Sequence, residues 1–184
     1  MKSLNEKRLN GKAVFDGALL HVRKDTVRLP NGKTSVREYI EHPGAVALVA
    51  WLPSGDLLML RQFRYPLKQV FIELPAGKID PGEMPEVTGL RELEEETGYR
   101  AKKLRFLTKI HPCIGYSDEV IYIYEAFGLE KGEKKPDDNE FMQVFSLSRN
   151  DAVKKVQTGE ITDVKTMVGI LAAKMRKDDD ESQE

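Results

Sequence analysis

The stretch that decides the fold lies near the middle of the chain, where residues 77–99 read GKIDPGEMPEVTGLRELEEETGY. Pro85 stands where a first helical turn would begin, because its fixed backbone angle suits that turn and its missing N–H is no loss there. Acidic residues follow early, and Gly98 comes where a helix would end in a left-handed residue. The stretch therefore predicts a loop followed by a helix over Pro85–Thr97.

The side chains of this helix divide between two faces when each residue is turned by about 100° from the last. One face is expected to pack into a core and carries Val87, Leu90, Leu93 and Thr97. The other gathers Glu92, Glu95 and Glu96, whose like charges repel, and Arg91 is the only cation in the helix. A hard divalent cation bound through oxygen atoms would relieve this repulsion, whereas an ordinary acidic face would leave it to solvent. The spacing is compatible with both readings.

Segments with strand patterns surround the helix on both sides. Alternating or apolar runs bounded by turn residues predict strands at 12–16, 19–29, 34–41, 44–52, 57–63, 70–74, 104–110, 120–129 and 141–147. Two helices should close the chain, at 148–158 with Ser148 as N-cap and at 162–176. This order indicates an α/β or α+β fold with a mixed sheet, preceded by an N-terminal antiparallel β layer. We expect a β-strand segment at 1–43, a main domain at 44–177 and a disordered acidic tail at 178–184.

Composition and charge limit the possible functions. The 184 residues carry a formal net charge of −1, which argues against a general nucleic-acid binder. The longest apolar run, residues 45–52, is far shorter than the roughly 18 residues that a membrane-spanning helix needs. Cys113 is the only cysteine, which rules out an internal disulfide, and the charged first residues do not read as a secretory signal. We therefore expect a cytoplasmic protein that binds neither membranes nor nucleic acids.

The fixed positions of the central stretch resemble a known signature. From Gly77 to Tyr99 the chain reads G-x5-E-x7-R-E-L-x-E-E-x-G-Y, which resembles the motif of the Nudix hydrolases. Outside the motif, HPGAVALVAW, RQFR, ELPAG and GYSDE resemble the Nudix subgroup that cleaves ADP-ribose and related nucleoside diphosphate sugars. The resemblance implies an α/β/α sandwich. It also implies Mg²⁺-dependent hydrolysis of ADP-ribose to AMP and ribose 5-phosphate, of GDP-mannose to GMP and mannose 1-phosphate, or of both.

The same resemblance assigns a metal site to the acidic helix. Mg²⁺, or Mn²⁺ in its place, would be held chiefly by Glu92 and Glu96. Glu95 would assist, and the backbone carbonyl of Ala76 would complete the ligand shell. An ion pair between Arg91 and Glu83 would brace the loop, which places both residues outside the direct ligands. The motif residues with this kind of structural role are Gly77, Glu83, Arg91 and Gly98.

Further residues are implied to act on the substrate. The general base would lie in the polar loop before a late strand, with Glu140 as the first choice and Asp138 as the second. Arg37 and Arg64 match positions that contact substrate phosphates, a task that suits the paired donors of a guanidinium group. The two acidic candidates outside the helix are Glu73, for the terminal sugar, and Glu119, for the periphery of the metal site.

Partners and rival functions complete the expectations. The nucleotide sugar is the implied substrate, and the resemblance implies a homodimer that exchanges its N-terminal strands. Ile114 stands where members specific for ADP-ribose tend to carry proline, so a broader preference that includes GDP-mannose is compatible. The alternatives are a hydrolase of nucleoside triphosphates or dinucleoside polyphosphates and a sensor of nucleotide sugars without catalysis.

Overall fold

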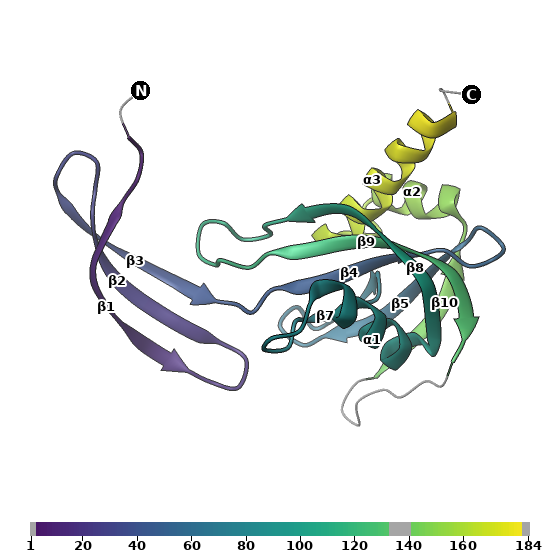
Figure 1. Ribbon diagram of the computed structural model, residues 1–184, viewed down its shortest axis with the longest axis horizontal. Coiled ribbons are helices and arrows are strands. Elements are labelled where there is room, and N and C mark those ends of the chain that lie inside the picture. The colour runs from purple at the N-terminus through teal and green to yellow at the C-terminus, as the bar shows by residue number, and fades with distance from the viewer. Residues whose placement is uncertain (1–2, 133–140, 182–184) are drawn as a thin grey trace. The chain divides into compact units, whose positions relative to one another are not determined.

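The structure is a computed structural model that describes residues 3–132 and 141–181, with side chains as far as Arg176 (Figure 1). Contacts within the chain divide it into two units. One unit comprises Met1–Pro43 and His111–Val120, and the other comprises Gly44–Ile110 and Ile121–Glu184. Among the described residues, no helix is long and apolar enough to span a membrane.

The first unit is built on a three-stranded antiparallel sheet in the order β1 (Lys7–Asp16), β2 (His21–Arg28), β3 (Thr34–Glu41). This confirms the expected N-terminal antiparallel layer. The later segment His111–Val120 joins the sheet, since the N–H of Ile40 donates to the carbonyl of Tyr116 at 2.8 Å. Every residue of β1 is exposed, and among the described residues of this unit only Asp25 and Val27 are buried. The unit therefore has almost no core of its own.

The second unit contains two sheets. The larger one has four strands in the order β7 (Ala76–Lys78), β4 (Ala45–Ala50), β9 (Ile121–Lys131), β8 (Tyr99–Ile110). β4 and β9 run parallel while the outer pairs are antiparallel, which confirms the mixed sheet. The smaller sheet is antiparallel, with the order β10 (Met142–Leu147), β5 (Leu57–Arg64), β6 (Gln69–Glu73).

Helices cover both faces of the four-stranded sheet. Figure 1 shows α1 (Pro85–Thr97) on one face, and α2 (Arg149–Gln157) with α3 (Val164–Glu181) on the other. Successive side chains of a strand point to opposite faces. Accordingly Val49 of β4 belongs to a buried cluster with residues of α2 and α3, whereas Leu48 belongs to a second cluster with Leu93 of α1. This is the expected α/β/α sandwich.

The predicted core face of α1 is wrong in part. Val87 and Leu90 are 52% and 40% exposed, and the buried residues of the helix are Thr88, Gly89, Leu93, Glu96 and Thr97. The cause is Gly89, which lets the helix approach β4 closely. A Cβ atom at Gly89 would lie 3.1 Å from Cγ1 of Val46. The buried arc of the helix therefore includes Glu96, which the sequence places on the opposite face.

One strand was missed and several element boundaries differ from the prediction, among them the start of β1 at Lys7 rather than at residue 12. β7 occupies residues that read as a loop after Pro75, but it pairs with β4 over three residues. β8 begins at Tyr99, directly after α1, rather than at residue 104. α3 begins at Val164 because Asp163 accepts a hydrogen bond from the N–H of Thr166 and thereby caps the helix. It continues to Glu181, into the segment expected to be disordered, since extending a formed helix needs no new nucleus.

Candidate active site

The loop before α1 and the helix itself bring the motif residues together. Gly98 ends the helix with a φ of 74°, and its N–H donates to the carbonyl of Glu94 at 2.8 Å. Gly77, in β7, lies directly against the helix. A Cβ atom at Gly77 would lie 1.9 Å from Cδ of Glu92, so only glycine leaves room for this carboxylate.

Glu96 is held from the side of the sheet. It is 5% exposed, and its Oε2 accepts a hydrogen bond from the N–H of Ala76 at 3.0 Å. Two residues that were assigned to the metal are therefore neighbours across α1 and β7. The side chains of Glu92 and Glu95 are more exposed, at 17% and 40%. The carboxylates thus form a group that runs from the buried side of the helix to solvent.

Arg91 is the shared partner of the other motif carboxylates. Its Nε and Nη2 donate to Glu83 at 3.3 and 3.0 Å. Its Nη1 donates to Oε1 of Glu92 at 2.9 Å and to Oε2 of Glu95 at 3.0 Å. The ion pair with Glu83 that the resemblance implies is present. The bonds to Glu92 and Glu95 are additional, and they supply an internal cation that the sequence did not predict for these two carboxylates.

The pair of Glu83 and Arg91 stays charged over a wide pH range. Hydrogen bonds from Arg91 and then from Thr88 lower the pKa of the Glu83 carboxyl from 4.5 to about 2. The Oγ1 of Thr88 donates to Oε2 of Glu83 at 2.7 Å. In return, the hydrogen bonds to Glu83 raise the pKa of the Arg91 guanidinium above its ordinary value. The pair therefore ties the loop to the helix at any pH at which the protein would work.

The residues around α1 fit a hard divalent cation in their chemistry. Mg²⁺ prefers oxygen ligands, and Glu92, Glu95, Glu96 and the carbonyl of Ala76 could supply them from two adjoining elements. Within the part of the chain that the structure describes, no three acidic, imidazole or thiol groups are gathered closely enough to enclose an ion. The contacts give the reason, because Arg91 holds Glu92 and Glu95 while the N–H of Ala76 holds Glu96. A cation would therefore have to compete with Arg91.

Arg64 and Glu73 form a second charged cluster in the same unit. Glu73 is 3% exposed, and Nε and Nη2 of Arg64 donate to its two oxygens at 2.7 Å each. Lys165 donates to the same carboxylate. Burial raises the pKa of the Glu73 carboxyl, but the hydrogen bonds from Arg64 and the charge of Lys165 outweigh it and leave the pKa below its ordinary value. Both oxygens are thus engaged within the protein, which favours a role in supporting Arg64 over a contact with the terminal sugar.

The remaining assigned residues lie elsewhere in the chain. Arg37 belongs to the first unit, where Nε and Nη2 of its guanidinium donate to Glu6. Glu119 also belongs to the first unit, and its Oε1 lies 3.9 Å from Nε2 of His42. Glu140 and Asp138, the two candidates for the general base, lie outside the described residues.

Sequence reasoning did not single out the supporting residues Thr88, Lys165 and Thr166. Thr88 is fully buried under the loop, and Thr166 is fully buried where its Oγ1 accepts the N–H of Leu74 at 2.9 Å. The sequence did contain a signal for Thr166. Asp163 is a residue type that caps helices, and recognising it would have placed Thr166 at the capped position. The burial of Thr88 depends on tertiary contacts and has no such local signal.

Comparisons with known proteins agree with this geometry. Residues 41–167 match the NUDIX domain, and residues 6–40 match the nucleoside diphosphate sugar hydrolase N-terminal domain. An ADP-ribose pyrophosphatase of Bacillus subtilis (strain 168) is 42% identical over 179 residues, covering 96% of this chain and 97% of the relative. A methanol dehydrogenase activator of Bacillus methanolicus is 39% identical over 171 residues, covering 92% of each chain. A crystal structure described as ADP compounds hydrolase superposes with a TM-score of 0.84 at 23% identity, covering 95% of this chain and 96% of that one, and so shares the fold.

Proposed function

Because the chain belongs to the Nudix family, we propose that it is a cytoplasmic, metal-dependent pyrophosphatase that hydrolyses the diphosphate bond of nucleoside diphosphate sugars. The products would be AMP and ribose 5-phosphate from ADP-ribose, GMP and mannose 1-phosphate from GDP-mannose, or both sets. One observation carries this proposal. Glu96 accepts the N–H of Ala76, Glu92 lies against Gly77, and Glu95 shares Arg91 with Glu92. These carboxylates occur in a chain whose residues 6–40 match the N-terminal domain of nucleoside diphosphate sugar hydrolases. The relative named ADP-ribose pyrophosphatase supports the same class of substrate.

The reaction needs a metal ion because the negative charge of a diphosphate repels an approaching nucleophile. Mg²⁺ or Mn²⁺, when bound, neutralises the diphosphate oxygens and lowers the pKa of a coordinated water. Glu92 and Glu96 would be the main ligands, with Glu95 and the carbonyl of Ala76 assisting. Gly77 keeps the space for Glu92 open. The structural residues of the motif hold this arrangement without touching the ion.

The substrate contacts are proposed in the same way. Arg64 would donate to a phosphate oxygen, since a guanidinium group offers fixed and permanently charged donors. Arg37 is proposed as a second phosphate contact and Glu119 as a further substrate contact, and both residues belong to the first unit. The attacking water must give its proton to a carboxylate, for which Glu140 is the first candidate and Asp138 the second.

The first unit favours a homodimer. Its sheet and adjoining segments leave exposed the apolar side chains of Leu4, Leu9, Val14, Phe15, Leu19, Leu20 and Val36. Exposed apolar side chains that gather in one part of a protein mark interaction surfaces. We propose that two chains associate through this unit, whose described residues bury almost nothing within one chain.

Two rival functions remain to be separated. A hydrolase of nucleoside triphosphates or dinucleoside polyphosphates would use the same metal site. A sensor without catalysis would act through a partner, and one relative is named for the activation of another protein, methanol dehydrogenase. The presence of Glu92, Glu95 and Glu96 favours catalysis over the sensor, because a sensor has no need of a metal-binding face.

The first experiment measures monophosphate release from ADP-ribose, GDP-mannose, UDP-glucose, ATP and diadenosine polyphosphates, each with Mg²⁺ and with EDTA. Metal-dependent cleavage of the diphosphate sugars is the expected result. Cleavage of ATP or diadenosine polyphosphates alone would instead support the first rival. Nucleotide-sugar binding without any cleavage would support the sensor.

Substitutions on α1 test the metal site directly. Glu92→Gln and Glu96→Gln should each lower kcat by about 100-fold or more, the scale on which loss of an active-site charge lowers turnover. Both should change the melting temperature little, because glutamine keeps an oxygen acceptor for Arg91 at position 92 and for the N–H of Ala76 at position 96. Glu94→Gln is the matched control, since Glu94 lies on the same helix but pairs with Arg100. Equal losses in all three variants would argue against a metal site at Glu92 and Glu96.

A further inference from the structure

The buried carboxylate of Glu73 pairs with two cations, Arg64 and Lys165. Glu73 is almost fully buried at the end of β6. Its Oε1 accepts a hydrogen bond from Nε of Arg64, and its Oε2 accepts from both Nη2 of Arg64 and Nζ of Lys165. A buried carboxylate is costly unless it is both paired and hydrogen-bonded. Here two cations from elements far apart in the sequence share that task, so the removal of either one changes how firmly Glu73 holds the other.

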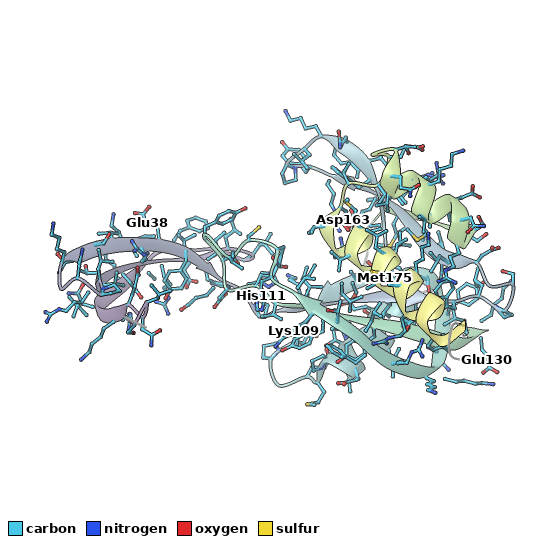
Figure 2. The ribbon with its side chains drawn as sticks, turned by 90° about the horizontal axis from the view of Figure 1, so that it is seen from above. Glu38, Lys109, His111, Glu130, Asp163 and Met175 are labelled. Atoms are coloured by element: carbon cyan, nitrogen blue, oxygen red, sulfur yellow. The ribbon has the colours of Figure 1, made fainter. Side chains whose placement is uncertain are left out.

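Lys165 is in turn held by the N-terminus of α3. Its Nζ donates to Oδ2 of Asp163 at 2.9 Å, and Lys165 itself is 9% exposed. The same Oδ2 accepts the N–H and the Oγ1 of Thr166, at 3.1 and 2.6 Å. Thr166 then accepts the N–H of Leu74, the residue that follows Glu73. Figure 2 shows Asp163 at one end of α3, with Met175 further along the helix. This end of α3 is therefore fastened to Glu73 and to the backbone beside it.

The arrangement leaves one part of Arg64 available. Nε and Nη2 are taken by Glu73, and Nη1 makes no hydrogen bond with any residue that the structure describes. The side chain is 44% exposed. The negative charge of Glu96, on the proposed metal face, is among the charges that act on Arg64. Arg64 is thus fixed by two of its nitrogens near the proposed metal face.

We propose that Lys165 is a positioning residue for Arg64: held by Asp163, it fixes Glu73, and Glu73 fixes the guanidinium so that Nη1 meets a phosphate oxygen of the substrate. This inference rests on the proposed function, since it takes Arg64 as a phosphate contact. It assigns Glu73 a supporting role in place of a contact with the terminal sugar. It also gives the start of α3 a part in substrate binding, although no residue of α3 touches the substrate in this scheme.

The test compares Lys165→Met with the wild type in hydrolysis of ADP-ribose and GDP-mannose. Methionine keeps most of the apolar stem and removes the charge. We expect KM to rise about tenfold, the scale of one charge-assisted hydrogen bond, with kcat changed less than about twofold. Lys165→Arg should recover much of the lost affinity. Lys155→Met is the matched control: Lys155 of α2 pairs with the exposed Glu160 that follows the helix, and the substitution should leave both constants unchanged.

A double-mutant cycle separates positioning from a general loss of structure. Arg64→Lys keeps a cation beside Glu73 but lacks the planar fork that Glu73 orients. In that background, Lys165→Met should raise KM less than about twofold further. An equal rise of KM in both backgrounds, or an unchanged KM in the single variant, overturns the proposal. If Lys165→Met does not fold, Asp163→Asn carries the same comparison, because it removes the charge that holds Lys165.

Binding distinguishes failure of this inference from failure of the proposed function. The wild type and Lys165→Met are compared for ADP-ribose binding in EDTA by calorimetry. If the wild type hydrolyses none of the diphosphate sugars, the proposed function has failed, and the ratio of the two dissociation constants still decides the role of Lys165. A ratio of about ten supports positioning, and a ratio near one contradicts it.

Discussion

Gly77 has no side chain, and the Glu92 carboxylate occupies the space that the methyl group of an alanine would fill. Gly77→Ala should push Glu92 aside and raise the Mg²⁺ concentration for half-maximal activity about tenfold or more, the scale on which misplaced metal ligands lose affinity. The measurement is a Mg²⁺ titration of ADP-ribose hydrolysis. Gly55→Ala is the control. An alanine held at the φ of 85° of Gly55 should lose about 1 kcal/mol of stability, but no atom lies within 4 Å of the added carbon. An unchanged Mg²⁺ requirement in Gly77→Ala would show that Glu92 is not a ligand.

The contribution of the Glu83 carboxylate to folding stability depends on pH. Its pKa falls from 4.5 to about 2 in the folded protein, so its contribution to stability is present above pH 4.5 and is lost as the pH falls through about 2. Glu83→Gln should therefore be less stable than the wild type at pH 6, and the difference in melting temperature should shrink as the pH falls from about 4.5 towards 2. Thermal melts in EDTA over this range provide the measurement. A difference that stays constant with pH would mean that the carboxylate charge does not stabilise the loop.

At the scale of elements, α3 is anchored to the sheet near its far end by Arg176. Its guanidinium donates to the carbonyls of Phe106 and Leu107 and lies 3.5 Å from Glu125, a buried carboxylate of β9. Arg176→Met should lower the free energy of unfolding by about 1–3 kcal/mol, because these acceptors lose a charged donor. Urea denaturation measures the loss, and the m-value should not change. Lys174→Met, at an exposed position on the same helix, should be neutral, and an equal loss there would contradict the anchoring role.

At the scale of the whole molecule, the exposed first unit predicts a dimer. Sedimentation should give twice the mass of one chain, and Phe15→Glu should shift the equilibrium towards monomer, because it places a charge on an apolar side chain that is 57% exposed. Met175→Glu is the matched control in the second unit, where Met175 is 68% exposed on α3. A wild type that sediments as a single chain at micromolar concentration would refute the proposed dimer.

Much of the fold could be predicted because its signals are local. The bounds of α1 follow from Pro85 and Gly98, and Ser148 caps α2 as expected by accepting the N–H of Asp151. The spacing of Glu92, Glu95 and Glu96 is likewise a local property of one helix. Strand patterns predicted most strands, but β7 was missed because three residues after a proline carry too little pattern.

The sequence by itself determined the acidic helix, its ends and the spacing of the carboxylates it carries, because caps and spacing act within a few residues. Only the tertiary structure decided which arc of that helix is buried, since the close approach at Gly89 depends on β4. It also decided that the segment 111–120 joins the N-terminal sheet and that Lys165 shares Glu73 with Arg64. These contacts join residues tens of positions apart, and their free energy comes from burial and charge pairing that exist only once the chain has folded.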